Sequence, residues 1–190
     1  YKRQVQCPDF AQVASDKKAY AKATRQQYDQ QDEIYGKTVI QRHGKQMLVQ
    51  NPPALSLTQE ELDAVYQLPF QRKPHPMYDA QGGVPGIAEV QFSIAHNRGC
   101  FGYCNFCSIA LHQGRRVTCR SEESILKEAK QITEMPNFKG YIHDVGGPTA
   151  NFRAPSCKKQ LTKGLCKGKK CLAPEICPAI YADHSEYLHI

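Results

Sequence analysis

Three closely spaced cysteines are the residues of this chain whose types and spacing point most directly to chemistry. Cys100, Cys104 and Cys107 follow the pattern C-x3-C-x2-C, and Gly99 and Gly102 give the loop the backbone freedom to curl around one centre. A closed structural zinc site takes four protein ligands. Three thiolates instead suit an iron–sulfur cubane with one iron left open. We therefore expect a [4Fe–4S] cluster here, with zinc or another metal as the alternative.

The total cysteine content favours metal binding over a secreted disulfide framework. The chain has 190 residues and 9 cysteines, of which only Cys7 falls in the first third. An odd count, with no export signal at the start of the sequence, is unlike a disulfide-stapled domain. No stretch approaches the roughly 20 apolar residues of a membrane span. We expect a cytoplasmic protein without a membrane partner.

A second group of cysteines lies in a lysine-rich segment near the end of the chain. It consists of Cys157, Cys166, Cys171 and Cys177, whose spacing lacks the C-x2-C pairs of common zinc modules. Either these four hold a second metal centre, zinc or an auxiliary cluster, or they are free thiols. The net charge of +7 permits an anionic partner such as RNA without requiring one. A solvated loop is the simpler interpretation of the lysines.

The residues before the cysteine loop predict a flanking region over residues 1–86. A long polar helix is expected over 9–33 and a β-hairpin over 37–50, with Gly44 in its turn. Thr58 is a suitable N-cap for a short helix. The prolines and glycines of 69–86 predict an extended connection.

The next segment, residues 87–152, has the pattern of a strand–helix–strand unit. We expect strands over 87–94 and 138–145, with a helix between them that Ser121 caps. Such βαβ units have parallel strands and gather ligands at the carboxyl ends of those strands. His96 either lines that end or makes an ordinary local hydrogen bond. The guanidinium of Arg115 either faces an anionic group or belongs to a polar turn before the helix. Residues 153–190 show little periodicity, and we expect them to be irregular.

The cysteine loop resembles that of the radical S-adenosylmethionine (SAM) superfamily, and further segments resemble its YgiQ family of uncharacterised proteins. The segments that carry the resemblance are Leu68-Pro69-Phe70, His75-Pro76, Phe92-Ser93-Ile94, Arg98-Gly99-Cys100-Phe101-Gly102, His112-Gln113-Gly114-Arg115, Arg120-Ser121, Phe138-Lys139-Gly140-Tyr141-Ile142 and the run from Asp144 to Asn151. The resemblance implies an α/β fold. A radical SAM barrel has about six βα units, so this chain would hold an incomplete (βα) barrel, its first βαβ unit, within a protein of several hundred residues.

The resemblance also implies the cofactors and the reaction class. A [4Fe–4S] cluster on Cys100, Cys104 and Cys107 would bind SAM and, with one electron from a flavodoxin- or ferredoxin-like reductant, generate a 5′-deoxyadenosyl radical that abstracts hydrogen from an unknown substrate.

The same resemblance implies SAM contacts at Gly146, Gly147 and Thr149 and at the carbonyl of Phe106. The acidic residue that often follows the two glycines is replaced here by Pro148. No catalytic side chain is implied. Two other functions stay open, a zinc-stabilised nucleic-acid-binding module and an electron-transfer segment that binds a cluster without SAM chemistry.

Overall fold

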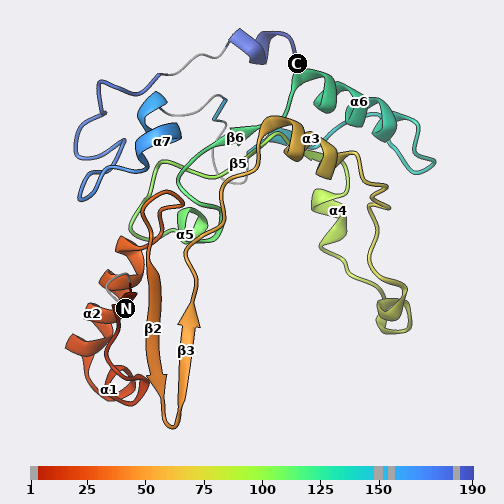
Figure 1. The fold of residues 1–190 in the computed structure, drawn as a ribbon. Coiled ribbons are helices and arrows are strands. Elements are labelled where there is room, and N and C mark those ends of the chain that lie inside the picture. The colour runs from red at the N-terminus through yellow and green to blue at the C-terminus, as the bar shows by residue number, and fades with distance from the viewer. Residues whose placement is uncertain (1–3, 148–151, 154–156, 182–184) are drawn as a thin grey trace. The chain divides into compact units, whose positions relative to one another are not determined.

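The computed structural model describes residues 4–147, 152–153, 157–181 and 185–190 (Figure 1). These residues form two compact units, each assembled from three separate stretches of chain. Unit 1 comprises residues 1–56, 101–116 and 157–180, and unit 2 comprises residues 57–100, 117–156 and 181–190. The division of the chain into flanking, core and C-terminal segments at residues 86 and 152 stays a prediction.

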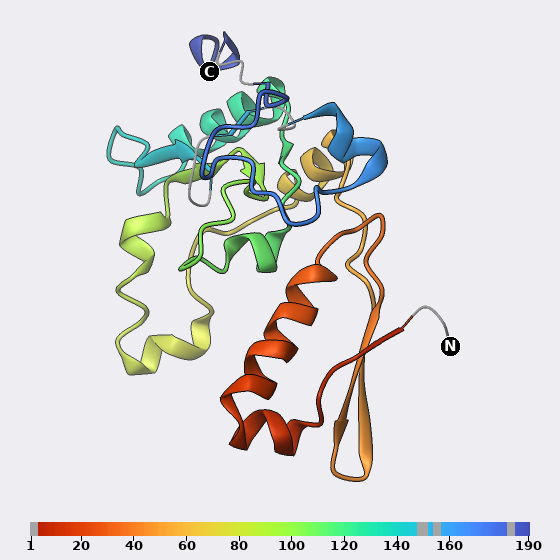
Figure 2. The ribbon, with the colours of Figure 1, turned by 90° about the vertical axis from the view of Figure 1, so that its left-hand side faces the viewer.

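Unit 1 contains a three-stranded sheet and four helices. Its strands are β1 (Gln4–Gln6), β2 (Thr38–His43) and β3 (Gln46–Gln50), and its helices are α1 (Phe10–Ser15), α2 (Lys17–Asp29), α5 (Ile109–Gln113) and α7 (Lys158–Lys163). The sheet order is β1-β2-β3, with β1 parallel and β3 antiparallel to β2. Figure 2 shows α1 and α2 alongside this sheet. Between them lies a small core of Cys7, Ala23 and Val39.

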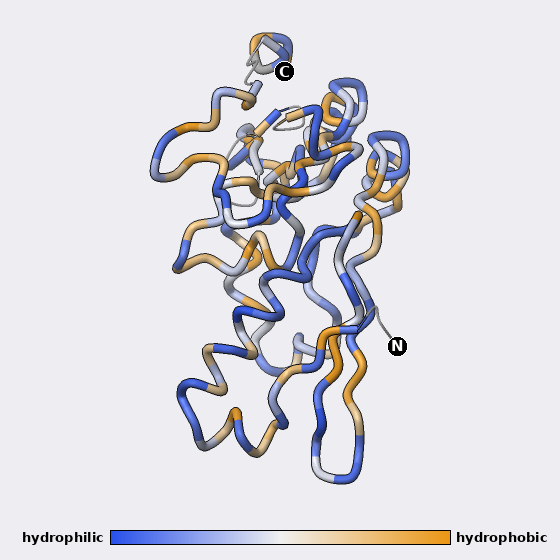
Figure 3. The backbone as a smooth tube through the Cα atoms, turned by 60° about the vertical axis from the view of Figure 1, so that its left-hand side comes forward, coloured by the Kyte–Doolittle hydropathy of each residue, from blue (hydrophilic) through white to orange (hydrophobic). Residues whose placement is uncertain are grey.

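The predicted hairpin is confirmed. Gly44 adopts a left-handed φ of 59° in the turn that joins β2 to β3, a conformation that glycine reaches without strain. The sequence did not reveal β1, because its partner lies more than thirty residues away. Met47, Leu48 and Val49 of the edge strand β3 are each more than half exposed, and Figure 3 shows hydrophobic residues in this hairpin beside the mostly hydrophilic α2.

The single helix expected over 9–33 is wrong in two respects, because the structure divides it at Asp16 and its second part ends at Asp29. Asp16 has an extended backbone (φ −123°, ψ 116°), and its carboxylate accepts hydrogen bonds from the backbone N–H groups of Lys18 (2.9 Å) and Ala19 (3.2 Å). A short acidic side chain competes in this way with helix continuation and starts a new helix instead.

Unit 2 contains two small sheets, three α-helices and two short 3-10 helices. Its helices are α3 (Gln59–Tyr66), α4 (Ile87–Val90) and α6 (Glu122–Thr133), its strands are β4 (Ser93–Ala95), β5 (Asn97–Arg98), β6 (Thr118–Cys119) and β7 (Asp144–Gly146), and its 3-10 helices are Pro76–Gln81 and Ser185–Leu188. Thr58 and Ser121 cap α3 and α6 as predicted. Within the described residues, no helix combines the length and apolar character needed to cross a bilayer.

The strand–helix–strand arrangement is confirmed in a shortened form. β4 and β7 pair in parallel, from Ser93 opposite Asp144 to Ala95 opposite Gly146, with α6 between them in the chain. A mixed α/β class with small sheets is therefore correct. Strand β5 pairs separately with β6 in an antiparallel ladder.

The expected strand boundaries are wrong at both strands. Residues 87–90 form the helix α4 after an N-cap at Gly86, because Ala88 and Glu89 are good helix formers. Residues 138–143 are not a strand, since Gly140 turns the chain with a φ of 96°. Phe138 and Ile142 nevertheless pack on the core of unit 2, so the hydrophobic pattern was informative about burial.

The core of unit 2 is built on the buried face of α6. Ile125 and Ile132 lie seven residues apart, about two helical turns, and pack with Phe92 and Ile94 from the region of β4. Phe92 also meets Phe138 edge to face, with ring centroids 5.5 Å apart.

Beside this core lies a network of buried charges. Arg120 is 1% exposed, and its guanidinium pairs with Glu128 and donates to the carbonyl oxygen of Ala95 (3.0 Å). Glu128 also pairs with Arg72, and the guanidinium of Arg120 lies 4.1 Å from the ring centre of Tyr66. Burial lowers the pKa of Arg120 to about 10, so it remains cationic at neutral pH. The network joins α3, β4 and α6 through one arginine.

We predict that Glu128→Gln destabilises the protein by about 3 kcal/mol, because it leaves two arginines without their carboxylate. Glu123→Gln is the matched control, since Glu123 is exposed in the first turn of the same helix and contributes less than about 1 kcal/mol there. Urea unfolding of the two variants measures the difference. Equal loss of stability in both would contradict a structural role for the Glu128 pair.

Candidate functional site

The loop that carries the three closely spaced cysteines turns sharply. Gly99 has a φ of 84° and Tyr103 a φ of 50°, both in the left-handed region. The N–H of Cys107 donates to the carbonyl oxygen of Cys104 (3.2 Å), which closes a tight turn between these two. Cys104 is exposed, while Cys100 and Cys107 are partly buried, and all three are free thiols. Reduced, accessible thiols on a turning loop are the donor set that an iron–sulfur cluster requires.

The three motif cysteines are divided between the two units. Among the described residues, no group of three or more His, Cys, Asp and Glu side chains is placed so that it could hold a metal ion. Cys100 belongs to unit 2, and Cys104 and Cys107 belong to unit 1. Their chemistry fits a cluster, and their role as ligands stays a prediction.

In unit 2, the predicted glycine turn lies at one end of the parallel sheet. Gly146 ends β7 opposite Ala95, and its carbonyl oxygen accepts a hydrogen bond from the N–H of His96 (2.9 Å). Cys100 follows Ala95 by five residues in the chain, with β5 between them. Gly146 is buried and Gly147 is half-buried. This is the carboxyl end of both strands, where parallel sheets bind ligands.

The other predicted SAM contacts lie elsewhere or outside the described residues. Thr149 belongs to the range 148–151, which the structure does not describe. Phe106 has a side chain that is 93% exposed, and it belongs to unit 1. The contact expected through its carbonyl oxygen stays a prediction.

His96 is wholly buried at the end of β4. Its side chain has 0% exposure, and its backbone carbonyl accepts from the N–H of Arg120 (2.8 Å). Burial, with a smaller contribution from the charge of Arg153, lowers the pKa of His96 to about 4. The imidazole is therefore neutral at pH 7 in the folded state.

We predict that His96 makes the protein less stable as the pH falls from about 6.5 to about 4. In that window the unfolded chain binds a proton that the folded chain does not bind, because the folded pKa of about 4 lies below the ordinary histidine pKa of 6.5. Arg153 and Arg120 disfavour the charged ring, while Asp144 acts in the opposite direction. The full effect is on the order of 3 kcal/mol.

Urea unfolding at pH 7 and pH 5 measures this dependence. His96→Gln should flatten it, while His189→Gln, which removes an exposed histidine of the same unit, should leave it unchanged. A wild-type stability that does not change between the two pH values would contradict the assignment.

The four C-terminal cysteines all belong to unit 1 and are free thiols. Lys159 donates to the sulfur of Cys166 (3.2 Å), Gln160 contacts the sulfur of Cys171 (3.7 Å), and the N–H of Cys177 donates to the carbonyl oxygen of Cys171 (2.9 Å). Burial raises the pKa of Cys171. The described residues show no shared metal geometry here, so a second centre stays a prediction.

Unit 1 also brings together residues that the sequence did not connect. Side chains from 25–37, 103–115 and 165–170 line one pocket. The lysines between 167 and 170 are a visible signal in the sequence. Their partners on α2 and after it lie about 130 residues away, beyond what local patterns reveal.

Comparison with known proteins gives a consistent result. Residues 1–93 match the family described as "Radical SAM N-terminal", a match that ends before Cys100. A protein named "UPF0313 protein" from Clostridium perfringens (strain ATCC 13124) is 53% identical over 190 residues, and one from Clostridium botulinum (strain Okra) is 53% identical over 186 residues. These matches cover 100% and 98% of this chain but 29% of each relative. No solved structure matches the chain significantly.

Proposed function

Because the chain belongs to the YgiQ/UPF0313 family of radical SAM proteins, we propose that it is the cluster-binding part of a radical SAM enzyme. Cys100, Cys104 and Cys107 are its ligands to a [4Fe–4S] cluster. The chain spans 29% of the length of the curated relatives it matches, and the substrate-binding part of the enzyme lies in the remainder. This chain corresponds to the start of the barrel, with β4, α6 and β7 as its first βαβ unit.

The observation that carries this proposal is the C-x3-C-x2-C motif in a chain of this family. Its three thiols are free, and its loop has the left-handed turns at Gly99 and Tyr103 that a wrapping loop needs. When bound, the reduced cluster would supply one electron to SAM, which would break a carbon–sulfur bond of the sulfonium and give methionine and a 5′-deoxyadenosyl radical.

The residues of this chain bind and orient rather than react. Gly146 and Gly147, at the end of β7, let the backbone approach SAM without a Cβ in the way. Thr149 and the carbonyl of Phe106 add hydrogen-bonding groups for the same molecule. We assign no catalytic side chain to this chain. The electron comes from a flavodoxin- or ferredoxin-like reductant in the cytoplasm.

The second candidate is a zinc-stabilised module that binds nucleic acid. Nine thiols and a lysine-rich segment favour it, because thiolates bind zinc and lysines bind phosphate. A second centre on Cys157, Cys166, Cys171 and Cys177, either zinc or an auxiliary cluster, is compatible with both candidates. The metal on the motif cysteines of the full-length protein distinguishes the two functions, since iron supports the radical SAM enzyme and zinc supports the nucleic-acid-binding module.

We predict that anaerobic reconstitution loads about four irons and four sulfides onto the motif cysteines, and that Cys104→Ala removes most of this iron. Cys7→Ala is the control, since Cys7 is 2% exposed in the core of unit 1 and burial raises its pKa. Iron and sulfide analysis with absorbance spectroscopy measures the outcome. Full zinc occupancy without iron uptake would support the nucleic-acid-binding module instead.

We predict that the reduced full-length protein converts SAM to 5′-deoxyadenosine and that Gly147→Val slows this conversion at least about tenfold. The added side chain would prevent the close approach of the backbone to SAM. Chromatography of the products measures the rate, and iron content shows whether the variant still holds its cluster. Gly86→Val is the control, because Gly86 lies at the end of the Pro/Gly-rich connection with a φ of −62° and open space around it. Unchanged turnover in a cluster-loaded Gly147→Val variant would contradict the SAM placement.

A further inference from the structure

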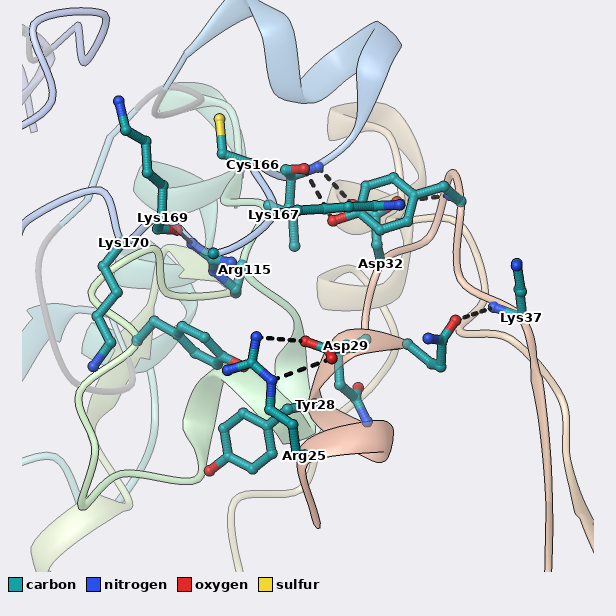
Figure 4. A pocket seen from close by; sticks show the side chains of 16 residues that line it. Arg25, Tyr28, Asp29, Asp32, Lys37, Arg115, Cys166, Lys167, Lys169 and Lys170 are labelled. Atoms are coloured by element: carbon teal, nitrogen blue, oxygen red, sulfur yellow. Dashed lines mark hydrogen bonds and ion pairs between the residues drawn. The ribbon is translucent and has the colours of Figure 1, made fainter. Parts of the chain in front are cut away.

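A basic pocket lies within unit 1. It has a volume of about 430 Å³, and every residue that lines it belongs to that unit. Figure 4 shows side chains of α2, of the following turn and of the segment 165–170 around the same hollow. Its six cationic side chains are Arg25, Lys37, Arg115, Lys167, Lys169 and Lys170. The volume is that of a small-molecule site rather than of a single ion.

The two carboxylates in the lining, Asp29 and Asp32, already have partners. Asp29 pairs with Arg25 at 3.0 Å. Asp32, which is 2% exposed, accepts backbone N–H groups of Ile34 (2.7 Å), Tyr35 (2.8 Å) and Leu165 (2.6 Å). Both carboxylates therefore stabilise the residues that form the pocket, through the ion pair of Asp29 and the backbone hydrogen bonds of Asp32.

The contacts described for the remaining cations are with neutral groups. The ammonium of Lys167 lies 4.6 Å from the ring centre of Tyr35, and Lys170 donates to the side-chain oxygen of Asn105. Neutral partners orient a cation without cancelling its charge, so the pocket retains a positive potential.

Arg115 makes the strongest case for an anionic ligand. It is 7% exposed, donates to the carbonyl oxygen of Lys169 (3.1 Å) and stacks 4.3 Å from the ring centre of Tyr103. Its Nε is buried without a hydrogen-bond partner among the described residues. A buried guanidinium is normally paired with a carboxylate or a bound anion. Arg115 has a carbonyl, a ring and the thiol of Cys171 instead.

We propose that this pocket binds a small molecule carrying one or more phosphate groups. A guanidinium and several lysines suit a multiply charged phosphate, which can accept many hydrogen bonds at once. The tyrosine rings of the lining provide apolar surface for the organic part of such a ligand. None of the three motif cysteines lines this pocket, although Tyr103 in its lining precedes Cys104 in the chain. The proposal goes beyond the SAM chemistry proposed above.

Isothermal titration calorimetry of the full-length protein with ATP, inorganic pyrophosphate and adenosine tests the proposal. ATP and pyrophosphate should bind and compete, and adenosine should bind at least about tenfold more weakly than ATP. Lys169→Gln, an exposed substitution, should weaken ATP binding about tenfold. Lys163→Gln is the matched control, since it removes an exposed lysine of the same segment that does not line the pocket.

Arg115→Lys tests the planar donor group, because it keeps the charge and loses the fork of N–H groups. It should also weaken ATP binding about tenfold, with circular dichroism showing that the fold is kept. Three results would overturn the proposal: no binding of ATP or pyrophosphate at millimolar concentration, equal effects of Lys163→Gln and Lys169→Gln, or adenosine bound as tightly as ATP. Single-stranded RNA that binds without competition from ATP would assign the lysines to nucleic acid instead.

Discussion

The carboxylate of Asp32 is the constraint on which unit 1 depends. It is buried and satisfied by three backbone N–H groups, two from the next three residues and one from Leu165. The hydroxyl of Tyr35 donates to the carbonyl oxygen of Leu165 (2.9 Å) and adds a further hydrogen bond between the same two segments. A buried carboxylate needs such donors, since its desolvation would otherwise be unfavourable. The C-terminal segment is thereby fixed to the end of α2, more than a hundred residues away.

Two glycines give the space that the hydrogen bonds around the Asp32 carboxylate require. A Cβ on Gly36 would lie 2.3 Å from the backbone oxygen of Asp32, and a Cβ on Gly164 would lie 2.6 Å from its carboxylate. Gly164 also has a φ of 70°, a conformation that other residues adopt with strain. The local sequence around each glycine gives no sign of this closeness. Features of this kind follow from contacts between distant segments and are invisible to pattern analysis.

Local signals, by contrast, predicted much of the fold. The caps at Thr58 and Ser121 and the hairpin turn at Gly44 depend on neighbouring residues, and all three are confirmed. The hydrophobic pattern indicated the βαβ unit but not the ends of its strands. Helix α4 and the turn at Gly140 replace parts of the two segments that were expected to be strands. For the candidate site, the family and the cysteine motif came from the sequence. The pocket in unit 1 required the structure.

Two buried arginines show how similar residues reach different roles. Arg120 has Glu128 beside it and so holds elements of unit 2 together, whereas Arg115 has only neutral partners among those described and leaves positive charge in a cavity. Burial alone does not distinguish a structural arginine from one that binds a ligand. The charge of the neighbouring side chain distinguishes them, because a buried cation needs an anionic partner from the protein or from a ligand.

The exposed side of the hairpin has a consequence for handling this part of the protein by itself. β3 is an edge of its sheet, and its central residues Met47, Leu48 and Val49 are each more than half exposed. An open strand edge with an apolar run can add a further strand from another molecule. In concentrated solutions of the isolated 190-residue piece, this edge is where self-association would start, and charged substitutions on β3 would be the first means of keeping it monomeric.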